Sequence, residues 1–83
     1  MFIKITSVTT QPIYVLLIGF STGEFKQFDI KPLISKHPQF EALTKIDGLY
    51  KEVKIDKDGC GLYWNDDLDL SANGLYELSI PAI

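Results

Sequence analysis

The chain has 83 residues, of which 46% are hydrophobic and 23% charged, values that are typical of a folded globular protein and exclude an intrinsically disordered one. A chain of this length builds one modest core, so we expect a single domain over residues 1–83. Its single cysteine, Cys60, excludes an internal disulfide, and its longest nearly apolar run, residues 14–20, is far shorter than the ~20 residues of a membrane helix. The first residues lack the basic region and apolar run of a secretory signal, which predicts a cytoplasmic protein without membrane attachment.

Charge is distributed unevenly within a net charge of −3. Residues 1–55 carry seven lysines and five acidic residues, whereas residues 56–83 carry one lysine and six acidic residues. All eight basic residues are lysines, so the planar guanidinium that binds phosphate or guanine through two hydrogen bonds is absent. We therefore expect no direct binding of nucleic acid.

Residues 2–30 predict three β-strands. Residues 2–8 alternate apolar and polar side chains and are followed by Pro12, which ends the strand. Residues 14–20 are apolar on both faces, which predicts a central strand, and Gly19 within it indicates a close approach by a neighbouring group. A turn at residues 21–23 leads into a third strand at residues 25–30, so these last two strands are expected to form a hairpin.

Residues 31–56 predict short helical turns followed by a strand. Pro32 and Pro38 suit the first turn of a helix and are disfavoured within a central strand. On one or two such turns a small apolar stripe can cover one face of the sheet, formed by Leu33, Ile34, Phe40 and Leu43. In residues 52–56, Val53 and Ile55 alternate with charged residues, as in an amphipathic strand.

Residues 57–77 predict a turn, a strand and a last helix. The turn at residues 57–59 precedes a strand at residues 61–64, and Ser71 is a suitable N-cap for a helical turn that runs to Glu77. The pattern predicts an α+β fold, a small antiparallel β-sheet of about five strands with one or two short helices packed on one face. We interpret Trp64 as the structural anchor of the core, packed against Leu68 and Leu70; the alternative is an exposed ring that stacks on a ligand.

The order and spacing of these landmarks resemble the short bacterial proteins of the domain of unknown function 2442 family. The matching segments are Tyr14-x-Leu16-x-Ile18-x-Phe20-x-x-Gly23-Glu24, Phe28-Asp29-Ile30-Lys31-Pro32-Leu33, Phe40-x-x-Leu43, Val53-x-Ile55-Asp56, and Trp64 followed by Asp69-Leu70-Ser71 and Leu75-Tyr76-Glu77. The resemblance implies an antiparallel sheet with small helices on one side, and it supplies no catalytic residue or cofactor. Some relatives are fused to a helix-turn-helix domain, and others are encoded beside a small protein in arrangements reminiscent of toxin-antitoxin pairs. The chain departs from the family pattern at Asn65, Ala72 and Asn73.

Candidate chemical sites in the sequence are incomplete. Five residues occupy positions 1, 3, 5, 6 and 12 of a calcium-binding loop, namely Asp56, Asp58, Cys60, Gly61 and Asp67. Position 5 is a cysteine and position 12 lacks the usual glutamate, so we interpret the segment as a hairpin turn and predict no metal and no cofactor. His37 is interpreted as solvated and Cys60 as a strand residue, because neither has a partner that would activate it. No catalytic residue is predicted.

The remaining functional signal is the acidic C-terminal part of the chain. We expect a noncatalytic protein-interaction module, of a toxin-antitoxin-like or regulatory pair, that binds a small basic protein partner. The candidate partner surface comprises Asp66, Asp67, Asp69 and Glu77. A homodimer through a sheet edge is a second form of partnership, because edge strands of a small sheet need a covering or a partner. The alternative function is a small metal-dependent hydrolase that uses the carboxylates from Asp56 to Asp69.

Overall fold

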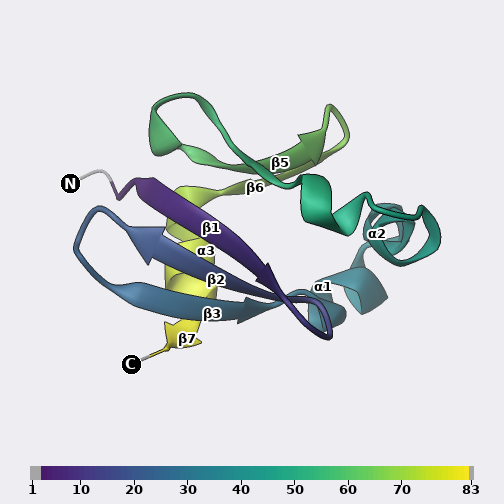
Figure 1. Cartoon of the computed structure of the whole chain (residues 1–83), viewed down its shortest axis with the longest axis horizontal. Coiled ribbons are helices and arrows are strands. Elements are labelled where there is room, and N and C mark those ends of the chain that lie inside the picture. The colour runs from purple at the N-terminus through teal and green to yellow at the C-terminus, as the bar shows by residue number, and fades with distance from the viewer. Residues whose placement is uncertain (1–2, 83) are drawn as a thin grey trace.

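A computed structural model describes residues 3–82 of the chain, which form two antiparallel sheets and several short helices (Figure 1). One sheet has the strand order β1-β2-β3-β7 and the other the order β4-β5-β6. The elements are β1 (Ile5–Gln11), β2 (Val15–Phe20), β3 (Phe25–Asp29), α1 (Lys31–Lys36), the 3-10 turn η1 (Pro38–Glu41), α2 (Ala42–Lys45), η2 (Tyr50–Glu52), β4 (Lys54–Ile55), η3 (Lys57–Gly59), β5 (Gly61–Asn65), β6 (Leu68–Ser71), α3 (Ala72–Leu78) and β7 (Ile80–Pro81). The α+β class with antiparallel strands is confirmed, and the strands divide between two sheets.

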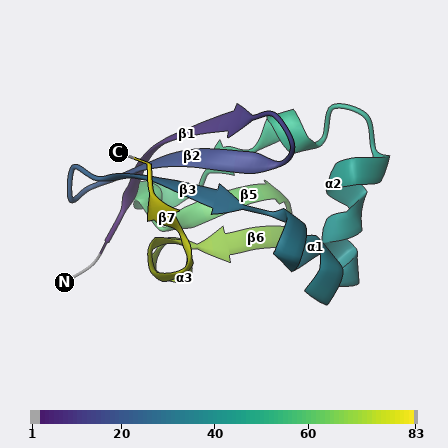
Figure 2. The same ribbon diagram turned by 90° about the horizontal axis from the view of Figure 1, so that it is seen from below.

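The two sheets enclose the core. Figure 2 shows β1, β2 and β3 in one layer and β5, β6 and α3 in a second layer, with α1 and α2 at one end of the molecule. The largest fully buried side chains come from both layers and from the segment before α1; they are Leu16, Ile18, Ile30, Leu62, Leu68 and Leu75. Each sheet alone would leave one apolar face in water, so packing the two together is what makes the fold stable.

Strand β2 is central in its sheet, as its two apolar faces predicted. It pairs with β1 on one side and with β3 on the other. Leu16 and Ile18 point into the core, whereas Val15 and Leu17 lie on the opposite face and are partly exposed. At Gly19 an added Cβ would meet the Ser7 side-chain oxygen of β1, so a larger residue there would require that side chain to move, which agrees with the close approach that the sequence indicated.

The connection between β1 and β2 adopts an unusual backbone conformation. Ile13 and Tyr14 have φ angles of 63° and 59°, in the left-handed region that a β-branched residue rarely occupies. The Tyr50 hydroxyl lies 2.7 Å from the Val15 carbonyl and 3.0 Å from the Gln11 carbonyl, and it shares its proton between them. These two hydrogen bonds join the residues on either side of the β1–β2 connection to η2.

The helices follow the sequence signals closely. Pro32 stands in the first turn of α1 and Pro38 begins η1. Phe40 and Leu43 are buried at the end of the core, so the short apolar stripe does cover part of it. The Ser71 hydroxyl accepts a hydrogen bond from the Gly74 N–H at 3.1 Å, which confirms Ser71 as the N-cap of α3.

Helix α3 is joined to the β2–β3 hairpin through Tyr76. The Tyr76 ring packs edge-to-face on Phe20, with 5.2 Å between ring centroids, and the Lys26 ammonium lies 3.7 Å from the centroid of the Tyr76 ring. The Tyr76 hydroxyl donates to the Glu24 carboxylate, which lowers the pKa of Glu24 and raises that of Tyr76. No helix within residues 3–82 is long and apolar enough to cross a membrane.

Candidate functional site

The hairpin formed by β5 and β6 carries three of the four predicted surface residues. Asp66 and Asp67 form its two-residue tip, between the paired residues Asn65 and Leu68, and Asp69 follows on β6. The Asn65 side-chain oxygen accepts a hydrogen bond from the Asp67 N–H at 2.9 Å, which fixes the turn. All three carboxylates are exposed. We call Asp66, Asp67 and Asp69 the acidic hairpin.

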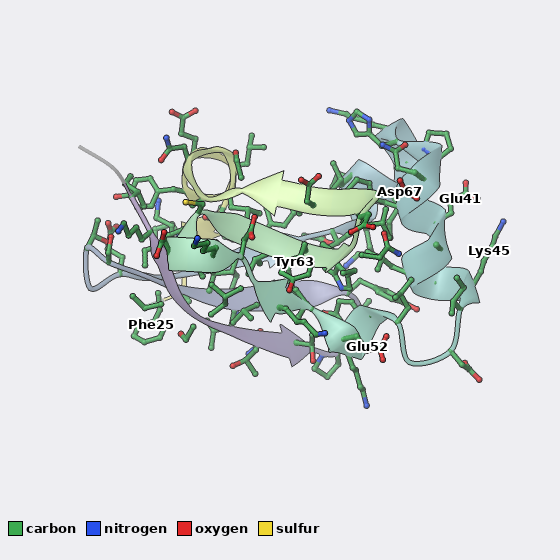
Figure 3. All side chains as sticks on the ribbon, turned by 90° about the horizontal axis from the view of Figure 1, so that it is seen from above. Phe25, Glu41, Lys45, Glu52, Tyr63 and Asp67 are labelled. Carbon is green, nitrogen blue, oxygen red and sulfur yellow. The ribbon has the colours of Figure 1, made fainter. Side chains whose placement is uncertain are left out.

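The outer face of the second sheet extends from the acidic hairpin. Tyr63 pairs with Asp69 on one side and with Lys54 on the other, so these three side chains project from the same face. Figure 3 looks onto this face and shows Tyr63 near its middle, with Asp67 toward the helical end. Within residues 3–82 the ion pairs are Lys31–Asp29 and Lys45–Glu41, so no lysine forms an ion pair with the acidic hairpin.

Glu77, the fourth predicted surface residue, lies apart from the acidic hairpin. It is exposed on α3, which follows the end of β6 opposite the hairpin tip (Figure 2). The structure therefore brings Asp66, Asp67 and Asp69 together and places Glu77 at the other end of the same layer.

Trp64, on β5, lies in the core. Its side chain is 5% exposed, and its ring meets Phe40 edge-to-face with 6.2 Å between centroids. The indole N–H donates to the Tyr50 carbonyl at 3.0 Å, which satisfies its one polar group. Trp64 is therefore not an exposed platform for stacking on a ligand.

The residues of the calcium-loop pattern are separated by a strand. Asp56 uses one carboxylate oxygen to accept the Lys57 N–H at 2.7 Å, which caps the turn η3. Asp67 lies beyond the far end of β5, a strand of five residues that spans about 17 Å. Within residues 3–82 no group of three or more His, Cys, Asp and Glu side chains is arranged to hold a metal ion.

His37 and Cys60 are both exposed. His37 follows α1, and its main-chain N–H donates to the Leu33 carbonyl at 2.9 Å. Cys60 ends the turn η3 immediately before β5, so the strand assignment is wrong by one residue. The cause is the turn itself, which includes Asp58 in the left-handed region and delays the start of the strand.

Two hollows were not predicted from the sequence. One of about 630 Å³ lies between the β1–β2 connection and the segment from α2 to η2. The other, of about 550 Å³, lies between β3, α1 and the residues after α3, and Lys36, His37, Leu78 and Ile80 are among its lining residues. Each combines segments distant in sequence. For the second hollow, the sequence signal was the alternation of apolar and polar residues in Leu78-Ser79-Ile80. The proline that follows is typical of an edge strand.

Asp29, which lines the second hollow, has a carboxylate that contacts Lys31. It accepts hydrogen bonds from the Lys31 N–H at 3.0 Å and forms an ion pair with the Lys31 ammonium at 2.9 Å. The hydrogen bond from the Lys31 side chain is the main cause that lowers the pKa of Asp29 below its ordinary value of 3.8, and the hydrogen bond from the Lys31 main-chain N–H lowers it further.

Comparison with known proteins identifies a family for nearly the whole chain. No curated protein and no solved structure matches it significantly. The family model described as "Protein of unknown function (DUF2442)" matches residues 5–81, from the first strand to the last. This chain is therefore a member of the DUF2442 family.

Proposed function

We propose that the protein is a noncatalytic interaction module whose acidic hairpin binds a basic protein partner. Three exposed carboxylates on one hairpin, with no ion-pair partner within residues 3–82, support this function most directly. Such a surface attracts a basic partner and repels phosphate backbones, so it favours a protein over nucleic acid.

The acidic hairpin is held in place before any partner binds. Trp64 and Leu68 on its two strands are buried, and the Asn65 side chain fixes the tip. A surface that is ordered in the free protein loses less conformational entropy on association. Rigid presentation of the carboxylates therefore supports a binding role.

The partner that we propose is a small basic protein in the cytoplasm. The family resemblance favours a product of a neighbouring gene, in a pair of the toxin-antitoxin or another regulatory kind. Glu77 takes part only if the partner is large enough to extend along β6 to α3, because the acidic hairpin and Glu77 lie at opposite ends of that layer.

Affinity capture from the source cell, with quantitative binding of the captured protein, tests this function. The variant Asp66→Asn/Asp67→Asn/Asp69→Asn should slow association and weaken binding while the thermal midpoint stays nearly constant, because exposed charges contribute little to folding. Binding by the unmodified protein should fall as the screening length decreases from ~10 Å at 0.1 M salt to ~3 Å at 1 M.

A matched control changes net charge equally at exposed positions outside the candidate partner surface: Asp47→Asn/Glu52→Gln/Asp58→Asn. This control should retain full binding to a partner confined to the hairpin, and the single variant Glu77→Gln reports whether the partner reaches α3. Equal binding by the hairpin variant and the unmodified protein, at both salt concentrations, would show that the partner binds elsewhere.

A further inference from the structure

A groove of about 550 Å³ opens between the end of β3, helix α1 and the segment after α3. Figure 1 shows β3 running along the edge of its sheet from β7 to α1. Leu78 and Ile80, which line this groove, are 73% and 63% exposed, and Val15 from β2 contributes further apolar surface. Large apolar side chains gathered in one hollow are typical of an interaction site.

The groove also exposes main-chain hydrogen-bonding groups of β3. In an antiparallel strand, successive residues direct their N–H and C=O groups to opposite sides. The Ile30 N–H donates to the Tyr14 carbonyl on the β2 side, whereas the Phe25 carbonyl accepts the Ala82 N–H on the β7 side. Asp29 lies four residues after Phe25, so its N–H and C=O groups also point to the β7 side.

Strand β7 does not extend along β3 as far as Asp29. Its paired residues are Lys26 with Pro81 and Gln27 with Ile80, and the next position opposite Asp29 falls to Leu78, the last residue of α3. The N–H and C=O of Asp29 therefore face the groove with no strand beside them, although the sheet continues up to that point. An unpaired strand edge accepts an additional extended segment.

The charge around the groove favours an anionic group. The Asp29 carboxylate is already bound by Lys31, with 2.9 Å between the charged atoms. Lys36 and His37 also line the groove, and neither forms an ion pair in the part of the chain that the structure describes. The imidazole of His37 provides a hydrogen-bond donor in either protonation state. Beside its apolar residues, the groove thus offers two donors to a carboxylate.

We infer that this groove binds an extended segment of a partner protein in which apolar residues alternate with acidic ones. The segment pairs with the main chain of Asp29, places an apolar side chain between Leu78 and Ile80, and directs a carboxylate toward Lys36 and His37. The open main-chain groups favour a polypeptide over a small apolar molecule, which would leave them unpaired. This site has the opposite charge preference from the acidic hairpin and is independent of it.

Titration of the isotope-labelled protein with two synthetic peptides tests the inference by nuclear magnetic resonance. One peptide is Ac-Gly-Ile-Glu-Ile-Glu-Ile-Gly-NH2, and the other has lysine in place of glutamate. The acidic peptide should shift the amide resonances of Asp29, Lys36 and His37 in a saturable way and slow hydrogen exchange at Asp29. The lysine peptide should bind at least about tenfold more weakly because its charges face Lys36.

Matched variants separate the groove from a general effect of charge or hydrophobicity. Leu78→Ser should weaken the acidic peptide about tenfold, whereas Ile13→Ser, at a residue 72% exposed and outside the groove, should leave its affinity unchanged. Lys36→Glu should weaken it several-fold, whereas Lys57→Glu, on the turn η3, should not. Thermal midpoints of all four variants verify that each is folded.

Four results would overturn the inference. The first three are equal binding of both peptides, absence of saturable shifts with the acidic peptide, and binding that is insensitive to both Leu78→Ser and Lys36→Glu. A fourth is the same set of shifts on raising protein concentration without peptide, together with a dimer in sedimentation, because the occupant of the groove would then be a second copy of this chain.

Discussion

The indole N–H of Trp64 donates a hydrogen bond to the main-chain carbonyl of Tyr50, with 3.0 Å between nitrogen and oxygen. The Tyr50 hydroxyl in turn donates to the carbonyls of Gln11, the last residue of β1, and Val15, the first residue of β2. Trp64 belongs to the second sheet and Gln11 and Val15 to the first, so Tyr50 connects the two layers. The acidic hairpin is therefore supported by a chain of contacts that reaches the opposite sheet.

Replacement of Trp64 by alanine should destabilise the protein strongly. The change removes a buried aromatic ring and leaves the Tyr50 carbonyl without its donor, so we expect a loss of about 3 to 5 kcal/mol in the free energy of unfolding. Urea denaturation followed by circular dichroism measures it. Phe25→Ala is the matched control, because the Phe25 ring is 46% exposed and should contribute much less. Equal losses for the two variants would contradict the role of Trp64 as the anchor of the core.

Removal of the Tyr50 hydroxyl should loosen the β1–β2 connection. In Tyr50→Phe the ring that packs on Tyr14 at 5.0 Å remains, while the hydrogen bonds to Gln11 and Val15 are lost. We expect a loss of about 1 kcal/mol in the free energy of unfolding and faster hydrogen exchange at the turn residues Ile13 and Tyr14. Tyr63→Phe, on the outer face of the second sheet, is the control and should change neither quantity. Unchanged exchange in Tyr50→Phe would mean that the turn holds its left-handed conformation without this hydroxyl.

Acid should destabilise the protein partly through Asp29. Its pKa is lowered in the folded protein, so the folded state binds fewer protons than the unfolded state and gains stability above the ordinary pKa of 3.8. That contribution is lost as pH falls through the lower, folded-state value. Asp29→Asn should therefore show a smaller fall in the urea midpoint between about pH 5 and about pH 2 than the unmodified protein does.

Asp47→Asn is the control for this pH effect, because Asp47 is exposed and forms neither an ion pair nor a side-chain hydrogen bond within residues 3–82. It should follow the unmodified protein across the same range. A parallel acid response in Asp29→Asn would show that Lys31 contributes no net stability through Asp29. The ion pair is exposed on both sides, so its contribution is small and salt should reduce it further.

The sequence predicted local structure better than the assembly of distant segments. The two apolar faces of residues 14–20 indicated a central strand, and Ser71 indicated the start of α3, because both signals depend only on neighbouring residues. Division into two sheets was not predicted, since alternation around Val53 and Tyr63 shows which side chains share a face but not which strands pair. The groove was missed for the same reason: Val15, Lys36 and Leu78 are brought together only by the tertiary fold.

The spatial grouping of the four candidate surface residues was predicted in part for a related reason. Asp66, Asp67 and Asp69 are close in sequence, so any turn at that point gathers them on one hairpin. Glu77 lies only eight positions after Asp69 in the sequence, but β6 carries the chain away from the hairpin tip before α3 begins. Spacing along the sequence thus predicted that the three aspartates lie together, but it could not predict the position of Glu77 on α3.

Calcium and chelators should leave the thermal stability unchanged. An ion that bound the folded protein would raise its thermal midpoint by mass action, with a shift that grows with ion concentration. In the folded chain Asp56 already caps a turn, and β5 separates it from Asp67, so the carboxylates of the calcium-loop pattern cannot surround one ion. Thermal melts in EDTA and in millimolar calcium should therefore coincide. Asp58→Asn serves as the second measurement, because a saturable upward shift with calcium that disappears in this variant would show that η3 binds the ion.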